Sequence, residues 1–406
     1  MSGDEMSVAL VGMGGYGEAY LKELLLEDRP NGLRFVAAVD SDPTRCTQLE
    51  QVRAHGAVIY RSLDEFFAKS NADLLVLSTP PQFHCEQVCA AVQHGCHVLC
   101  EKPLGAEPQQ VWRMIEARDK AGKQVAIGYQ WSFSAPIQRL KQDIIAGKFG
   151  KPKRFKTAVY WPRDERYYKR NGWAGRQRDA QGRLVLDSPV NNACSHYLHN
   201  MFYVLGDRLD RSDQPKWVTA ELYRANAIEN YDTAVLLSQT VRGVDLLFIA
   251  THATQNQKEP LLHYEFEKGT VVCGGDDGDE IIARMADGST VNYGRPILAD
   301  SPQKLVDVSQ SIRAGKPPAC GLEAASAQTF CMFAAQQSTA KINDFPDSMI
   351  VVVGEPDSRR TYVSGLEKML DRCFDKFQLP SELGMKWAKP AKKIVVNEPP
   401  FLDAKP

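Results

Sequence analysis

The first third of the chain alternates short apolar runs with segments of helical periodicity. The apolar runs are SVALVG, RFVAAVD, LLVLST, HVLCEKP and QVAIGYQ. The segments between them, such as FHCEQVCAAVQHG and PQQVWRMIEARDKAG, place apolar residues at helical spacing. Continuous apolar runs predict strands buried on both faces, and strands that alternate with helices predict a parallel sheet. Ligands bind such a sheet beyond the carboxyl ends of its strands.

A glycine-rich loop follows the first of these runs. The pattern G-x-G-x-x-G is met, with one additional glycine, by Gly12, Met13, Gly14, Gly15, Tyr16 and Gly17. In this pattern the first glycine makes a tight turn, the second lets a pyrophosphate approach the backbone, and the third lets the helix pack on the strand. The loop therefore predicts a dinucleotide site at the N-terminus of the following helix.

Asp40 ends the second predicted strand and bears on which dinucleotide binds. A carboxylate there can accept hydrogen bonds from both hydroxyls of an adenosine ribose, and its charge repels a 2′-phosphate. NAD is therefore favoured as the cofactor. Ser41 and Arg45 keep NADP open, and Asp40 could instead cap the next helix.

The stretch VLCEKPLG ends a predicted strand with Glu101, Lys102 and Pro103. We expect Lys102 at the edge of the sheet where the nicotinamide ring of a bound dinucleotide lies. Its amine could donate to a substrate hydroxyl or, once its reference pKa of about 10.4 is lowered, take the hydroxyl proton. The alternative is a strand-end lysine paired with Glu101 in solvent.

The segment DSPVNNACSHYLHNMFYVLG predicts a helix that Ser188 caps and Gly206 ends. One side of this helix is apolar, and the other carries uncharged polar residues, namely Ser188, Asn192, Ser195, His196 and His199. Exposed helix faces normally carry charges, so this side suits a cavity that makes selective hydrogen bonds. A buried contact between domains, or two histidines that are already hydrogen-bonded, are the alternatives.

The segment YWPRDERYYKRNGWAGRQRDAQGRL is rich in Tyr, Trp and Arg and reads as a loop. Trp161 or Trp173 could stack on a sugar ring, and Arg163 and Arg176 could bind hydroxyls or carboxylates. Single-stranded nucleic acid is another ligand of such loops. We prefer a substrate lid or an oligomer contact because the protein as a whole is neutral.

Alternating runs later in the chain predict a second sheet. They include KWVTAELYRAN, TAVLLSQTV, VDLLFIATHAT, LLHYEFEKGTVVCGG and EIIARMADGSTVNYG, with two helical stretches after Ser301. A sheet with one uncovered face usually has a partner, so we expect a homodimer or homotetramer through the open sheet.

Composition narrows the choice of partner. The chain has 406 residues, 43% of them hydrophobic, with 49 basic and 50 acidic residues. This balance favours a small molecule over nucleic acid or a membrane surface. The N-terminus has acidic residues where a signal peptide needs basic ones, so we expect a cytoplasmic protein. The cysteines and histidines of FHCEQVCAAVQHGCHVLC match no paired zinc spacing, and we expect no metal there.

The motifs VGMGGYG, STPPQFH and EKP, in this order and spacing, resemble the Gfo/Idh/MocA family, named for glucose-fructose oxidoreductase and inositol dehydrogenase. The resemblance implies an NAD(P)-binding Rossmann domain over residues 1–131. It also implies a substrate-binding and oligomerisation α/β domain over 132–406, with a large open, mostly antiparallel sheet and a C-terminal extension.

The same resemblance implies roles for particular residues. Lys102 would be the catalytic acid/base, and Glu101 would help to hold it and the nicotinamide ring. The cofactor would also contact Ser78, Thr79, Pro80, His84 and Gln130, with Trp131 on the substrate side. Family members often have an arginine where this chain has Ser132.

On the predicted polar helix the family has an Asp-x-x-x-His pair, which here is Asn192 and His196. His196 would orient a hydroxyl and assist proton movement. Asn192 can hold a hydroxyl but cannot accept a proton at neutral pH, and His199 is a possible substitute.

These observations lead to three hypotheses. The first is an NAD(P)-dependent oxidoreductase that moves a hydride between the nicotinamide and a hydroxyl carbon of a sugar, polyol or cyclitol. The second is an NAD-dependent glycoside hydrolase of the same family, in which transient oxidation permits elimination of the leaving group and NAD is recycled. The third is a non-catalytic nucleotide or sugar sensor, since a fold does not fix an activity.

Overall fold

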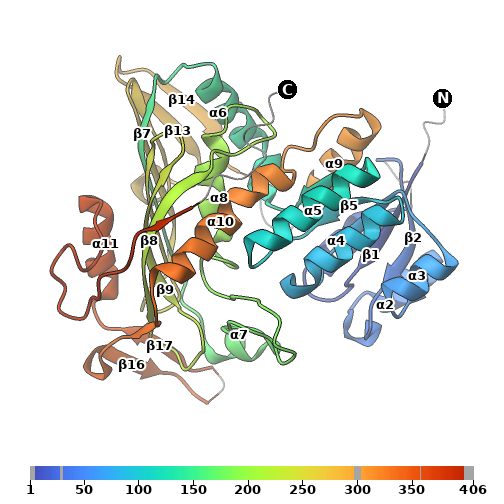
Figure 1. Ribbon diagram of the computed structural model, residues 1–406, viewed down its shortest axis with the longest axis horizontal. Helices are drawn as coiled ribbons and strands as arrows, with labels where there is room; N and C mark the ends of the chain where they lie inside the picture. The colour runs from blue at the N-terminus through green and yellow to red at the C-terminus, as the bar shows by residue number, and fades with distance from the viewer. Residues whose placement is uncertain (1–4, 28–30, 297–302, 357, 397–406) are drawn as a thin grey trace. The chain divides into compact units, whose positions relative to one another are not determined.

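The structure of the chain is a computed structural model, and it describes residues 5–27, 31–296, 303–356 and 358–396 (Figure 1). The chain forms two compact units. The first comprises Met1–Ser134 and Ile297–Ala325, and the second comprises Ala135–Pro296 and Ser326–Pro406. Each unit is therefore assembled from two separate stretches of the chain.

The first unit is built on the parallel sheet that the apolar runs predict. Its strands are β1 (Met6–Val11), β2 (Leu33–Val39), β3 (Val58–Tyr60), β4 (Leu74–Leu77), β5 (His97–Cys100) and β6 (Val125–Ile127). Their order is β3-β2-β1-β4-β5-β6, and every pair is parallel. The order reverses direction between β1 and β4, which is the switch point at which such sheets bind ligands. The predicted Rossmann sheet is confirmed.

Helices follow the strands of this unit. They are α1 (Gly17–Leu24), α2 (Leu49–His55), α3 (Leu63–Lys69), α4 (His84–Gln93), α5 (Pro108–Ala121) and α9 (Gln303–Arg313). Local signals set their ends: Ser62 accepts a hydrogen bond from Glu65 N at the start of α3, and Gly122 ends α5 in the left-handed conformation.

The stretch up to Ala325 returns to the first unit, whereas the sequence analysis placed it in the second domain. Two contacts fix it there. Arg118 of α5 forms two hydrogen bonds of 2.7 Å with Glu323, and Ala126 of β6 bridges Gly321. Contacts between residues about 200 positions apart leave no trace in local periodicity, so the pattern could not reveal them.

The second unit contains a mixed, mostly antiparallel sheet, as predicted. Its order is β14-β13-β12-β11-β7-β10-β9-β8-β15, and β18 also pairs with β8. Only β7 with β10 and β8 with β15 run parallel. The strands are β7 (Pro152–Tyr160), β8 (Pro215–Arg224), β9 (Thr233–Thr240), β10 (Asp245–Thr251), β11 (Lys258–Phe266), β12 (Gly269–Cys273), β13 (Ile281–Met285), β14 (Thr290–Gly294), β15 (Asn343–Asp344) and β18 (Ile394–Val395).

A separate two-stranded sheet and five helices complete the described elements of this unit. The sheet pairs β16 (Ile350–Val353) with β17 (Arg360–Val363). The helices are α6 (Ala135–Ile145), α7 (Glu165–Lys169), α8 (Ser195–Val204), α10 (Leu322–Ser338), which begins in the first unit, and α11 (Leu366–Lys376). None of the helices in the described ranges is long and apolar enough to span a bilayer.

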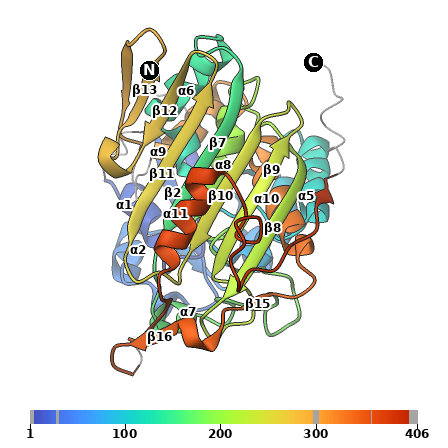
Figure 2. The same cartoon turned by 90° about the vertical axis from the view of Figure 1, so that its left-hand side faces the viewer.

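Helix α11 covers part of the sheet face that the sequence analysis expected to be open (Figure 2). Its buried side chains, Leu366, Leu370, Cys373 and Phe374, lie at helical spacing and pack against Ala158, Tyr160, Leu247 and Ile249 of β7 and β10. Over these strands the chain itself supplies the apolar cover. A dimer or tetramer through the sheet stays a prediction.

The opposite face of the sheet is covered by α8, which is almost entirely buried (Figure 1). His199 of this helix has no exposed surface, and its ring stacks on Tyr203 with 5.4 Å between centroids. Tyr203 also receives the ammonium of the buried Lys141 over its ring at 3.6 Å. Burial, aided by the charge of Lys141, lowers the pKa of His199 from 6.5 to about 3.

We expect Leu370→Ala to lower the free energy of unfolding by about 2–5 kcal/mol, because it opens a cavity beneath α11. Lys368→Ala on the exposed side of the same helix should change it by less than about 0.5 kcal/mol. Urea titration of both variants measures the difference. Equal stability of the two variants would show that α11 is not packed on the sheet.

We expect His199 to make stability pH-dependent. Its pKa is lowered to about 3 in the folded chain, so the unfolded chain binds more protons between that value and pH 6.5. This contribution to stability is complete above pH 6.5 and is lost as the pH falls towards 3. His199→Gln should reduce the slope of unfolding free energy against pH by up to about 1.4 kcal/mol per pH unit in this range. Urea titrations at several pH values measure this slope for both proteins. Equal slopes would contradict the assignment.

Candidate active site

The predicted dinucleotide loop lies at the carboxyl end of β1 and leads into α1. Gly12 has a φ of +86°, and a Cβ on it would lie 2.6 Å from the carbonyl oxygen of Ser78. A Cβ on Gly17 would lie 2.1 Å from the carbonyl oxygen of Gly12, so only glycine lets α1 approach β1 this closely. At Gly14 the nearest atom to such a Cβ is 3.8 Å away, so this position is less crowded than the other two.

Asp40, at the end of β2, holds this loop. One carboxylate oxygen accepts a hydrogen bond from Met13 N at 2.8 Å, and the other accepts one from Asp42 N at 2.9 Å. The short 3-10 helix Pro43–Arg45 has Asp42 at its N-cap position, so Asp40 does not cap it. Ser41 and Arg45 lie beside it and are exposed. The three side chains are therefore placed along one edge of the glycine loop.

The Ser78–His84 stretch joins β4 to α4. Ser78 N donates to Val11 O at 2.8 Å, which fastens the start of this stretch to β1. His84 is fully buried, and its ring nitrogens lie 2.8 Å from Pro103 O and 2.9 Å from Thr79 O. Burial lowers the pKa of His84, and the two carbonyl oxygens oppose this shift. The ring lies between the loop after β4 and the loop after β5. The contact between His84 and the cofactor stays a prediction.

Glu101 is the centre of a buried polar network that the sequence analysis missed. Its carboxylate accepts a hydrogen bond of 2.5 Å from Tyr20 OH and forms an ion pair with Lys304 of α9. Lys304 is 1% exposed and also lies 3.0 Å from Tyr16 OH. Burial and the charge of Glu101 raise the pKa of Tyr20. Lys304 lies about 200 residues from its partner, so no local signal could have revealed it.

Lys102 follows β5 directly, at the carboxyl edge of the sheet and next to the switch point. Glu101 does not lie in solvent, as the expected alternative required. Glu101 is only 6% exposed, and in the described part of the chain its carboxylate binds Tyr20 and Lys304 and accepts one hydrogen bond from the backbone N of Lys102. The side chain of Lys102 is half-buried.

Gln130, Trp131 and Ser132 lie in the 3-10 helix Gln130–Phe133 that follows β6. All three are buried, with exposures of 7%, 9% and 1%. Ser132 N donates to Tyr129 O at 2.9 Å. The position of Ser132, where an arginine is common in the family, is therefore inside the first unit.

In the second unit the polar segment folds differently from the expectation. The predicted helix start at Ser188 is wrong, because 189–194 form turns and α8 begins at Ser195. Ser188 Oγ instead accepts a hydrogen bond from Asn191 N and donates to Tyr231 OH. Asn192 and His196 keep partial exposure, whereas Ser195 and His199 are fully buried. The position of His199 does not suit substrate contact.

Asp187 is a second residue that the sequence analysis missed. It is 3% exposed, and its carboxylate accepts hydrogen bonds from Asn192 Nδ2 at 2.8 Å and Gly175 N at 2.6 Å. Asn192 occupies the position of the family's aspartate. The structure thus sets a carboxylate directly behind the asparagine and fixes the orientation of its amide.

The aromatic and basic segment contains α7 and is otherwise irregular. Arg163 is half-buried, with its guanidinium 4.9 Å from the ring centre of Tyr167 and 5.7 Å from that of Trp161. The ring centroids of Trp161 and of Tyr197 in α8 are 5.6 Å apart. Trp173 lies under Arg170, and Arg176 is exposed. Arg163 and Trp161 therefore lie beside α8, whereas the Arg176 side chain faces solvent.

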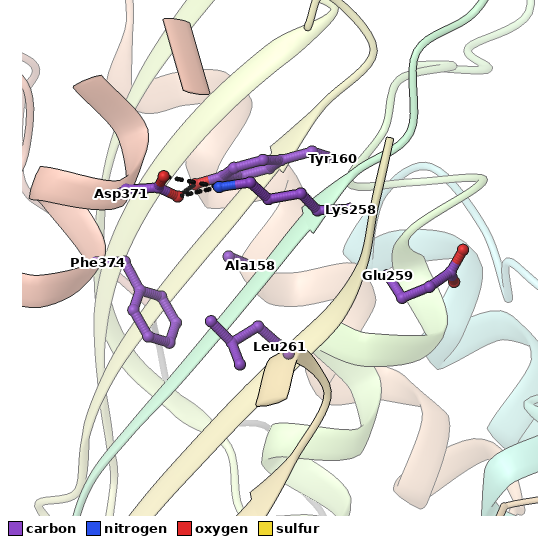
Figure 3. Close-up of a pocket in the computed structure, with 8 residues that line it drawn as sticks. Ala158, Tyr160, Lys258, Glu259, Leu261, Asp371 and Phe374 are labelled. Carbon is purple, nitrogen blue, oxygen red and sulfur yellow. Dashed lines mark hydrogen bonds and ion pairs between the residues drawn. The ribbon is translucent and has the colours of Figure 1, made fainter. Parts of the chain in front are cut away.

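A pocket of about 310 Å³ lies under α11, on the other face of the sheet (Figure 3). Its polar groups bind one another: Lys258 Nζ lies 2.6 Å from Asp371, and Tyr160 OH donates to Asp371 at 3.1 Å. Leu261 and Phe374 line the rest. None of the predicted site residues lines this pocket.

The cysteines do not form a metal site among the described residues. All ten are free thiols, and all but Cys89 are buried. Over the described ranges no group of three or more His, Cys, Asp and Glu side chains could hold an ion. Cys85 and Cys89 instead direct their sulfurs at backbone oxygens of α5.

Comparison with known proteins assigns the first unit. Residues 6–129 match the family model GFO_IDH_MocA, an oxidoreductase family with an NAD-binding Rossmann fold. Inositol 2-dehydrogenase of Renibacterium salmoninarum is 32% identical over 146 residues, which are 36% of this chain and 43% of that protein. D-glucoside 3-dehydrogenase of Escherichia coli is 26% identical over 150 residues, 37% of this chain and 42% of that protein. The chain thus spans less than half of the length of these curated relatives.

Solved structures match more of the chain. WlbA dehydrogenase of Bordetella pertussis, in complex with NADH and UDP-GlcNAcA, has a TM-score of 0.68 and 25% identity over 83% of this chain and 96% of that one. An oxidoreductase of Agrobacterium radiobacter, in complex with NAD+, L-tartaric acid and magnesium, has a TM-score of 0.68 and 18% identity over 83% and 96%. Residues 6–129 of this chain thus match the NAD-binding Rossmann domain of the Gfo/Idh/MocA oxidoreductase family.

Proposed function

We propose that this protein is an NAD-dependent oxidoreductase that transfers a hydride between the nicotinamide and a hydroxyl-bearing carbon of a sugar, polyol or cyclitol. The observation that carries the proposal is the position of Lys102 at the carboxyl end of β5, with the neighbouring Glu101 already bound by Tyr20 and Lys304. Lys102 thus directly follows a strand, at the edge where ligands bind such sheets.

The glycine loop fits a dinucleotide. The loop around Gly14, just before α1, would hold the pyrophosphate. Asp40 would accept hydrogen bonds from the adenosine ribose and would disfavour the 2′-phosphate of NADP. Bound NAD would supply the hydride acceptor.

Lys102 would act as the acid/base at the hydroxyl oxygen of the substrate. Oxidation of the alcohol requires that the hydroxyl proton leave, and a neutral amine next to the oxygen can take it. The network around Glu101 would keep the backbone of Lys102 in place, since Glu101 accepts a hydrogen bond from Lys102 N. Lys304 and Tyr20 are therefore positioning residues.

His196 and Asn192 would orient the hydroxyls. Asn192 cannot take a proton, but its amide is held by Asp187, which gives it a defined orientation towards a ligand. The relatives support a cyclic polyhydroxy substrate, because their names are those of inositol and glucoside dehydrogenases.

We expect Lys102→Met to lower kcat with the preferred substrate by about 10²–10⁴-fold, the usual contribution of a general acid or base. Binding of NADH, measured by nicotinamide fluorescence, should be retained. Lys120→Met, at an exposed position of α5, should leave both unchanged. Undiminished turnover in Lys102→Met would remove the proposal.

A panel of sugars, polyols, cyclitols and aryl glycosides, each with NAD and separately with NADP, identifies the reaction. Net accumulation of NADH indicates dehydrogenation. Release of aglycone without net NADH indicates the redox-assisted glycosidase. Tight NADH binding with no turnover of any compound indicates the sensor.

We expect two glycine substitutions to separate cofactor binding from folding. The methyl group added by Gly14→Ala lies at least 3.8 Å from its nearest neighbour, so this variant should fold normally. It should weaken NADH binding by at least about tenfold, because the methyl group would lie where the pyrophosphate approaches the backbone. Gly17→Ala places its methyl group against Gly12 O and should cost about 1–3 kcal/mol of stability. Thermal melts and NADH titration measure the two effects. Normal NADH binding by Gly14→Ala would place the dinucleotide elsewhere.

A further inference from the structure

Four side chains, two after β7, one in α7 and one after β10, each have a buried polar atom without a hydrogen bond in the described part of the second unit. They are Trp161, Arg163, Tyr168 and His252, and we call them the Arg163 cluster. Trp161 Nε1, Arg163 Nε, Tyr168 Oη and His252 Nε2 are buried and make no hydrogen bond within the described structure. Buried polar atoms are almost always hydrogen-bonded, so several such atoms in one place need an explanation.

Contacts show that these side chains are neighbours. Trp161 O accepts a hydrogen bond from His252 Nδ1 at 2.7 Å, and Arg163 N donates to His252 O at 3.2 Å. Tyr167 lies among them, 5.5 Å from the ring of His252, 5.2 Å from the ring of Tyr168 and 4.9 Å from the guanidinium of Arg163. Trp161 also touches Tyr197, next to His196 on α8.

The Arg163 guanidinium forms no ion pair with a carboxylate among the described residues. Within the described residues the one hydrogen bond of the Arg163 side chain is a long one, 3.4 Å to Pro162 O. Asp164 is paired with Arg166, and Asp187 accepts hydrogen bonds from Asn192 and Gly175. A half-buried guanidinium without an anion is costly unless a ligand completes it.

His252 contributes an acceptor and no charge. It is 2% exposed, and burial, together with the charge of Arg163, lowers its pKa to about 3. Since Nδ1–H donates to Trp161 O, the proton-free Nε2 can accept a hydrogen bond. The cluster therefore offers donors from Trp161, Arg163 and Tyr168 and one acceptor from His252.

This set of groups fits a carboxylate next to a hydroxyl. A guanidinium and an indole N–H can bind the two oxygens of a carboxylate, and a hydroxyl on the adjoining carbon can donate to His252 Nε2. The Arg170 guanidinium lies 3.7 Å from the ring centre of Tyr167, so charge alone does not separate a carboxylate from a phosphate. The acceptor His252 Nε2 favours a carboxylate with a hydroxyl on the adjoining carbon. In the pocket under α11, in contrast, Lys258 is already paired with Asp371.

We propose that the Arg163 cluster is a substrate subsite that selects a carboxylate, so that the substrate is a sugar acid and not a neutral sugar. The inference deepens the proposed function and rests on it, because it identifies the ligand of the second unit as the substrate. Arg163 is a specificity-determining residue here, and Trp161 and His252 complete its contacts.

Equilibrium binding to the full chain in the presence of NADH tests the subsite without requiring turnover. The probes are D-glucuronate, D-galacturonate and D-gluconate, each compared by calorimetry with D-glucose or D-galactose, and glucose 6-phosphate. We expect at least one acid to bind roughly 10- to 100-fold more tightly than its parent sugar, as charge-assisted hydrogen bonds usually provide. Arg163→Gln should remove this preference and leave the affinity for the parent sugar within about twofold.

Three further variants control for folding. Arg178→Gln makes the same change at an exposed arginine of the same segment and should keep the preference. Arg163→Lys keeps the charge and should retain part of the preference for the acid. Trp161→Phe keeps a ring against Tyr197 but loses the N–H and should weaken acid binding several-fold. Thermal melts verify that each variant is folded.

The inference is overturned if no acid binds better than its parent sugar, if the phosphate binds better than every carboxylate, or if Arg163→Gln keeps the preference. Two further outcomes distinguish failure of the subsite from failure of the proposed hydride transfer. Turnover of neutral sugars without any acid preference would remove only the subsite. Arg163-dependent acid binding without reduction of NAD would support the subsite and remove the hydride transfer.

Discussion

The buried ion pair between Glu101 and Lys304 is the constraint on which the candidate site of the first unit depends. A carboxylate with 6% exposure cannot stay charged without a partner, and Lys304 and Tyr20 satisfy it from two different helices. The pair joins the end of β5 to α1 and α9, and so it fixes the backbone from which Lys102 projects. The chemistry proposed for the amine therefore relies on a charge that takes no part in the reaction.

Much of the first unit could be predicted from the sequence because its signals are local. The apolar runs, the glycine loop and the placement of Asp40 and Lys102 at strand ends each follow from a few consecutive residues. The glycines show why such motifs are informative: a Cβ on Gly12 or Gly17 would collide with a backbone oxygen, so the loop permits no other residue at these positions. The alternating strands of the second sheet were equally accessible from their periodicity.

The remaining features could not be predicted because they depend on residues that are distant in the sequence or on irregular turns. Lys304 reaches Glu101 through the folded chain. Asp187 is close in sequence to Gly175 and Asn192, but it joins them within irregular turns that periodicity does not describe. Helical spacing placed His196 and His199 on one polar face, yet turns precede Ser195, and the stacking of His199 on Tyr203 takes that ring into the core. Unpartnered polar atoms such as those of Trp161 and Arg163 are properties of packing, and composition only indicated that the segment could bind a ligand.

The division of each unit between two stretches of the chain also limits how the protein can be dissected. A fragment ending at Ser134 would contain all six strands of the parallel sheet but would lack α9. Its glutamate after β5 would then have to find water or take up a proton, and the loop around the amine would loosen. Excision of the nucleotide-binding half as a stand-alone module therefore requires grafting the later helix back onto it.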